Sequence, residues 1–269
     1  MHNTFSKLLS IVNDIHQRYV PSYLPVRTKA ILDGLIDTTR NFQVSTYQKY
    51  AKAEGWEPTP LNIIWHFKSV EGKIIFLPKE NLYILFYNRD RLIERKKWTI
   101  AHELGHYFCG HLLRNYTAPP ASLEDAKQRE REQEAEANRF ASCLLVPPWV
   151  LVEAAGRYGR KDVMAFYSLC RCIFRLSKEA SYFVARNTAS TFQKYGIQVL
   201  RKHWDTMHEK YHPVLSTSLY TIFHTCQDFD SFVRAYNHEY DMLNLLHTGN
   251  MLGTVMHGPY SIAQCMGLD

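Results

Sequence analysis

The sequence lacks the features that would place it in a membrane or in an oxidising compartment. Among its 269 residues no apolar run approaches the roughly 20 needed to span a bilayer. The first residues also lack a signal-peptide core. The six cysteines form no Cys-x-x-Cys pair, and their spacing does not suggest a disulfide framework. We therefore expect a soluble, cytoplasmic protein with free thiols and no membrane partner.

A concentrated block of positive charge is also missing. The net charge is +6, from 32 basic and 26 acidic residues spread along the chain. A dedicated nucleic-acid binder usually gathers its basic residues into one patch or stripe, so we do not expect direct nucleic-acid binding. The 46% apolar and 22% charged residues are typical of a globular protein, and the length allows one large domain or two smaller ones.

The spacing of apolar residues divides the chain into segments of different kinds. It predicts helices over 4–18, 26–39 and about 44–54. The runs at 61–67, 73–77 and 82–87 are rich in β-branched and aromatic residues and predict two or three antiparallel strands. Helical spacing returns afterwards and continues past residue 189. We therefore expect an α+β fold that is mostly helical, with a small antiparallel sheet and a helical C-terminal extension.

A His-Glu-x-x-His motif lies at residues 102–106, within a segment of helical spacing that ends at Gly110. His102 and His106 are four residues apart, which places them about 40° apart on one helix face and lets both imidazoles reach one ion. Glu103 lies about 100° further round, where a carboxylate can touch a metal-bound water rather than the metal. The motif therefore predicts a zinc-hydrolase helix, although five matching residues alone are weak evidence.

A catalytic zinc site usually has three protein ligands and an open position for water. The nearest candidate for the third ligand is His111, five residues after His106. The metzincin pattern requires six, and on a continued helix His111 would point about 140° away from His106. We expect His111 to lie at the helix end, where the helix dipole favours an imidazole.

A long charged stretch from residue 124 to 141 offers carboxylates for this third position. Its second half carries an apolar stripe at residues 137, 140, 141, 144 and 145, and Glu134 and Asn138 fall on or beside that stripe. An inward carboxylate needs a partner, which a metal held by two histidines supplies. Glu136 is the rival, but it points about 200° from Glu134 and towards solvent. We predict Glu134 as the ligand and Asn138 as a hydrogen-bond partner of a ligating histidine.

The segments 95–106 and 134–147, read together, resemble the ImmA/IrrE family of zinc metallopeptidases, which carry a gluzincin-like site. The segment 174–182 resembles the helix that closes that domain. The best match covers residues 30–188. The resemblance implies a zincin-like metallopeptidase domain over 1–188 and leaves 189–269 as an extension of unknown role. It also implies one Zn²⁺ held by His102, His106 and Glu134, with Glu103 as the general base.

By the same resemblance the protein is an intracellular endopeptidase that cleaves an XRE-type helix-turn-helix repressor of a mobile element or stress regulon. We expect an extended substrate to pair with an edge strand formed by Leu82, Tyr83, Ile84, Leu85, Phe86 and Tyr87. Two other readings stay open. The zinc can be structural in a non-proteolytic regulator, such as a toxin–antitoxin component, or the protein can act on DNA through helices between residues 163 and 186.

A second His-Glu-x-x-His motif occurs at residues 208–212. Glu239 follows His212 at nearly the spacing that separates His106 from Glu134. Pro213 is expected to end the helix at His212, and Lys210 places a cation inside the motif. We therefore predict a polar helix end on the surface here rather than a metal site.

Overall fold

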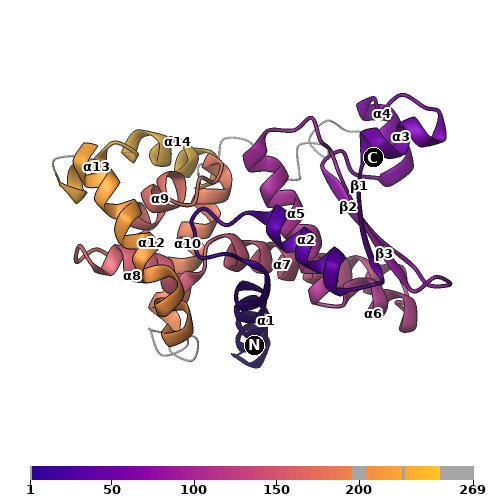
Figure 1. The fold of residues 1–269 in the computed structure, drawn as a ribbon, viewed down its shortest axis with the longest axis horizontal. Helices are drawn as coiled ribbons and strands as arrows, with labels where there is room; N and C mark the ends of the chain where they lie inside the picture. Colours follow the sequence, from indigo (N-terminus) through magenta and orange to yellow (C-terminus); the bar gives the residue numbers. More distant parts are fainter. Residues whose placement is uncertain (1, 196–203, 226–227, 249–269) are drawn as a thin grey trace. The chain divides into compact units, whose positions relative to one another are not determined.

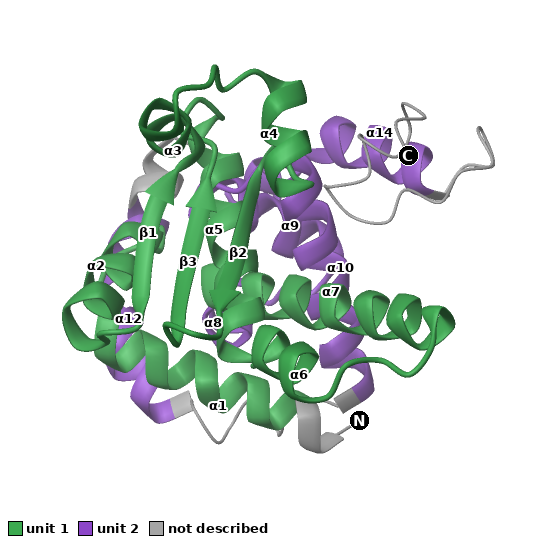
Figure 2. Ribbon diagram, turned by 90° about the vertical axis from the view of Figure 1, so that its right-hand side faces the viewer, with its two compact units in different colours: residues 1–147 green, residues 148–269 purple. Residues whose placement is uncertain are grey.

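The computed structural model describes residues 2–195, 204–225 and 228–248 and confirms the mostly helical α+β class (Figure 1). The chain divides into two compact units, residues 1–147 and 148–269 (Figure 2). This division does not coincide with the boundary expected at residue 188, which stays a prediction about the extent of the family domain. In the described residues, no helix is both long and apolar enough to cross a membrane.

The first unit contains seven helices and three strands among its described residues. In chain order they are α1 (His2–Tyr19), α2 (Thr28–Thr38), β1 (Phe42–Thr46), α3 (Tyr47–Glu54), α4 (Pro60–Phe67), β2 (Gly72–Leu77), β3 (Leu82–Tyr87), α5 (Ile93–Phe108), α6 (His111–Thr117) and α7 (Leu123–Leu145). The helices expected near the N-terminus and around the 102–106 motif are therefore confirmed, as are the strands at 73–77 and 82–87.

The three strands form one sheet in the order β1-β3-β2, with β3 in the middle (Figure 2). β3 is antiparallel to β2, as predicted, but parallel to β1. The sheet is therefore mixed. The expectation of a helix from about residue 44 was wrong over its first residues, because β1 runs to Thr46. The Thr46 hydroxyl then accepts from the Lys49 N–H and starts α3.

The expected strand at 61–67 is also wrong, because these residues form most of α4. Thr59 caps the helix by accepting a hydrogen bond from the Asn62 N–H, and Pro60 occupies the first turn. These start signals outweigh the β-branched composition. Ile63 and Phe67 then lie one helical turn apart and are buried in one cluster with aromatic neighbours from the sheet and α3.

The position of β3 corrects the predicted substrate-binding strand. Residues Leu82 to Tyr87 are hydrogen-bonded on both sides, to β1 and to β2, so they offer no free edge to an incoming peptide. β2 is an outer strand of the described sheet. The Ile74 N–H of β2 donates to Glu103 rather than to β3, so this side of β2 faces the helix that carries the 102–106 motif.

A close crossing between α5 and α7 brings the two sequence motifs together. A Cβ atom added at Gly105 would lie 2.9 Å from the Ala137 Cα and 3.0 Å from its carbonyl oxygen. Both residues are buried, so only glycine fits between the two backbones. α1 also packs against α7. The buried His16 ring of α1 is hydrogen-bonded through Nε2 to the Leu144 carbonyl of α7 at 2.9 Å.

Gly105→Ala is expected to lower the free energy of unfolding by about 1–3 kcal/mol, because the added methyl group must push α7 backbone atoms away. Chemical denaturation measures this change. Gly156→Ala is the control, since its Cβ would meet only the flexible end of Lys161, at 3.4 Å. An equal, small effect of both substitutions would show that the α5–α7 crossing is not tightly packed.

The second unit is helical in its described residues, as expected for the C-terminal extension. It contains α8 (Pro148–Gly156), α9 (Val163–Cys172), α10 (Lys178–Tyr195), α12 (Trp204–Thr225), α13 (Phe229–Arg234) and α14 (Asn237–Thr248). α9 packs against α8, α10 and α13, and α12 packs against α8. Cys109, Cys143, Cys170 and Cys172 form no disulfide, whereas Cys226 and Cys265 lie outside the described residues.

α12 continues through Pro213, so the expectation that the helix ends at His212 was wrong. A proline inside a helix costs about 3 kcal/mol or more, because one backbone hydrogen bond is lost and the ring crowds the preceding turn. Burial of a stripe along α12 offsets this cost. Its members recur every four residues and are all almost fully buried: Met207, Tyr211, Leu215 and Leu219.

Candidate metal centre

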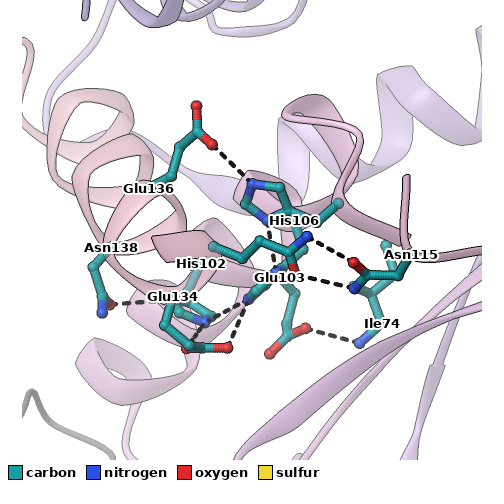
Figure 3. A network of polar contacts seen from close by, with 10 residues as sticks. Ile74, His102, Glu103, His106, Asn115, Glu134, Glu136 and Asn138 are labelled. Carbon is teal, nitrogen blue, oxygen red and sulfur yellow. Dashed lines mark hydrogen bonds and ion pairs between the residues drawn. The ribbon is translucent and has the colours of Figure 1, made fainter. Parts of the chain in front are cut away.

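Three predicted residues meet at one point in the first unit (Figure 3). The two oxygens of Glu134, on α7, each lie 3.2 Å from the Nε2 atom of one histidine on α5, His102 or His106. The two Nε2 atoms lie 3.1 Å from each other. Ligands bound at about 2.0–2.2 Å in tetrahedral geometry are about 3.4 Å apart, so these separations fit one small ion.

The His102 ring is oriented by a hydrogen bond to Asn138. Asn138, one turn after Glu134 on α7, places its side-chain oxygen 3.0 Å from His102 Nδ1. An amide oxygen only accepts, so Nδ1 carries the proton and Nε2 faces Glu134 with a lone pair. Asn138 therefore lies where the sequence predicted it, in contact with one of the two motif histidines.

His106 is oriented by His111 and Glu136, two residues considered as ligands but not predicted to pair with each other. The His111 ring lies between His106 and Glu136, with its Nδ1 2.9 Å from His106 Nδ1 and its Nε2 3.1 Å from a Glu136 oxygen. If His111 donates to Glu136, it accepts from His106, and the His106 Nε2 lone pair then faces Glu134. Burial lowers the pKa of His111, which favours this neutral form.

Two expectations about these residues were wrong. His111 does not simply end the motif helix. Gly110 adopts a left-handed conformation with φ +70°, the chain turns, and His111 begins α6, where it is 1% exposed. Glu136 does not face solvent, since its side chain is 25% exposed against 45% for Glu134. The sequence offers no signal for this pairing, because it depends on the turn at Gly110.

Glu103 is buried beside the three converging residues and is hydrogen-bonded to the sheet. One of its oxygens accepts the Ile74 N–H of β2 at 2.8 Å. Gly72, two residues earlier, leaves room for this approach, because a Cβ there would meet Thr99 at 2.4 Å and Glu103 at 3.7 Å. The carboxylate is thus fixed between α5 and β2, next to the three converging side chains but not among them.

The electrostatic environment favours a cation at the convergence point. Burial alone would raise the pKa of Glu134, but hydrogen bonds and charge interactions with His102 and His106 hold it well below its usual range. Burial alone would lower the pKa of His102. The neighbouring carboxylates Glu134 and Glu103 have a larger combined effect, so the pKa of His102 is raised above its usual value. A proton or a metal ion therefore stabilises this cluster, and the two compete for the same nitrogen atoms.

Two further groups of potential ligands occur in the described residues. Cys109, His111 and Glu136 lie together beside the first cluster and share the His111–Glu136 pair. The other group lies in the second unit and consists of Glu153, His208 and His212. Glu239, the carboxylate considered for the second motif from its spacing, instead contacts Tyr167, Arg171 and Lys178.

Comparison with known protein families agrees with the motifs. Residues 67–181 match the family model described as the IrrE N-terminal-like domain, a peptidase family. This range includes the motif helix, the inward-facing part of α7 and residues 174–181 of the segment 174–182. A search of curated proteins finds no match. The chain therefore contains a domain of the ImmA/IrrE family of peptidases.

Proposed function

We propose that this protein is a zinc-dependent endopeptidase, and that His102, His106 and Glu134 hold the ion. The observation that carries this proposal is the convergence of two imidazole nitrogens and a carboxylate, with Glu103 buried beside them. Two histidines and a glutamate form one of the common ligand sets of catalytic zinc. A zinc ion bound there would act as a Lewis acid and lower the pKa of water towards about 7.

Glu103 is the general base in this proposal. It takes a proton from the attacking water and later passes it to the leaving amine. The Ile74 N–H holds one carboxylate oxygen at 2.8 Å, which leaves the other oxygen for proton transfer. Burial between α5 and β2 keeps the carboxylate at a fixed place relative to the two histidines of the same helix.

The outer edge of β2 is the best candidate for binding an extended substrate. Because Ile74 directs its N–H away from β3, Gly72 and Phe76 also direct their backbone groups to that side in an antiparallel strand. A peptide that added to this edge would lie beside the motif helix.

The family resemblance points to a helix-turn-helix repressor as the substrate and to the cytoplasm as the site of action. Incubation of the zinc-loaded protein with purified XRE-type repressors, followed by intact-mass analysis, tests this proposal. Defined cleavage products that disappear with a chelator and return with zinc are expected. A panel of repressors that all remain intact would contradict the substrate class, and unfolded casein as an additional substrate tests peptidase activity separately.

His111→Ala is expected to weaken zinc binding by about 10–100-fold, because His106 loses the partner that fixes its ring. Competition with a fluorescent chelator measures this change. His66→Ala is the control, since His66 lies on α4 and stacks on Trp56, outside the metal cluster. Unchanged affinity in His111→Ala would show that the ring of His106 is held by other means.

A further inference from the structure

The second His-Glu-x-x-His motif has a carboxylate partner that its spacing did not reveal. His208 and His212 lie on α12, and Glu153 reaches them from α8 in the same unit. Its two oxygens lie 3.2 Å from His208 Nδ1 and 3.1 Å from His212 Nδ1. These separations match those of the first cluster, and they are close to the roughly 3.4 Å between ligands of a tetrahedral zinc ion.

A cationic side chain already lies where these three residues converge. One guanidinium nitrogen of Arg157 is 2.6 Å from a Glu153 oxygen and 2.7 Å from His212 Nδ1. Arginine only donates hydrogen bonds, so Nδ1 of His212 acts as an acceptor and directs a lone pair to this point. The second guanidinium nitrogen donates to Ser216 at 2.9 Å. The cluster is therefore built around a positive charge.

Glu153 is suited to hold such a charge. Its side chain is only 13% exposed. The Arg157 guanidinium donates a hydrogen bond to one of its oxygens at 2.6 Å and balances its negative charge. The buried stripe of α12 fixes the backbone that carries both histidines, since Tyr211 lies between them in the sequence and is 1% exposed.

We propose that Glu153, His208 and His212 form a second metal site, for a divalent transition ion of the zinc class, in which the ion takes the place of the Arg157 guanidinium. An ion about 2.1 Å from the same Glu153 and His212 atoms would overlap the guanidinium nitrogen. The Arg157 side chain must therefore swing out when the ion binds. Arg157 follows the last residue of α8 and its side chain is 25% exposed. It can therefore swing out by breaking its hydrogen bond to Ser216 while α8 stays folded.

This second site is structural or regulatory rather than catalytic. In the first site, Glu103 is buried and hydrogen-bonded to the backbone of β2. Glu209, the residue at the corresponding place of the second motif, is exposed. A metal ion held by Glu153, His208 and His212 would instead link α8 to α12 and stabilise the second unit by binding its folded form.

Competition with Arg157 gives the proposal a distinctive test. Arg157→Gln should tighten binding at the second site by at least about tenfold, because no internal cation has to leave. Titration of the full-length, metal-free protein with Co²⁺, followed by its visible absorption, and with Zn²⁺ against a chelating dye measures both sites. Two ions per chain are expected, the weaker one at the second site.

Three variants separate the second site from the first. Paired substitution of His208 and His212 by alanine should leave one ion per chain, and so should Glu153→Gln. Glu239→Gln, which removes a carboxylate of the same unit bound to Arg171 and Lys178, should leave two. Circular dichroism verifies that each variant is folded.

A stoichiometry of one ion in both the wild-type protein and Arg157→Gln would overturn the proposal. So would a second ion that survives in a folded His208/His212 variant. Neither result bears on the first site, because Glu103, His106 and Glu134 are unchanged in all these variants.

Discussion

Replacing Glu103 by glutamine is expected to lower the rate of peptide hydrolysis by about 10²–10⁴-fold, while metal binding and the fold are retained. The amide has the shape of the carboxylate, and its oxygen can still accept the Ile74 N–H. It cannot take a proton from water, so only the proton-transfer step is lost. The effect should therefore appear in kcat, with little change in KM.

The rate is measured on whichever protein substrate the repressor or casein incubation identifies, and zinc content is measured on the same samples. Glu94→Gln is the matched control, because Glu94 lies in the first turn of the same helix and outside the metal cluster. Full activity of Glu103→Gln would exclude this residue as the base. A loss of zinc together with activity would instead mean that Glu103 is a ligand.

The second large effect is expected from Glu134→Ala. This substitution removes one of three proposed ligands and leaves only the two imidazoles, so zinc affinity should fall by at least about 10³-fold. Glu136→Ala should weaken zinc binding much less, by about 10–100-fold, because Glu136 acts on His106 only through His111. The two residues lie on the same helix, two positions apart, and act as controls for each other.

Competition with a chelator of known affinity, measured on folded protein, ranks the zinc affinities of these two variants. The reverse order, with Glu136→Ala losing the metal and Glu134→Ala retaining it, would show that the ion binds on the other side of α7. That outcome would point to the neighbouring group of Cys109, His111 and Glu136 as the metal site.

The helical parts of the fold were predictable because their apolar residues recur at helical spacing, as in α1, α2 and α5. The errors occurred where two local signals compete. In α4 a Thr-Pro start outweighs the β-branched run that follows it. In β1 a short strand joins the sheet only through β3, 41 residues later in the sequence. Such a long-range pairing leaves no trace in the periodicity of five residues.

The candidate site was predictable to the extent that it depends on helix phase. One face of α5 carries His102 and His106, and one face of α7 carries Glu134 and Asn138. The structure brings these two faces together. The rest depends on how elements meet. The pairing of His111 with Glu136 requires the turn at Gly110, and the contact between Glu153 and the second motif requires α8 to pack against α12.

Pro213 illustrates the same limit. Its effect on a helix is a local property that sequence reasoning can estimate, at about 3 kcal/mol. Whether α12 continues past it depends on how much burial the helix gains elsewhere. The stripe that includes Tyr211 and Leu215 supplies this burial, and only the tertiary structure reveals it.

We propose that His102, His106 and Glu134 hold a zinc ion with a fourth position open to water. Anomalous diffraction at the zinc absorption edge, from crystals of the zinc-loaded protein, tests this proposal most directly. A strong peak is expected within about 2.0–2.2 Å of the two Nε2 atoms and of Glu134, with water completing the coordination. A fourth protein ligand in place of water, or no peak between α5 and α7, would contradict it and favour a structural role for any bound metal.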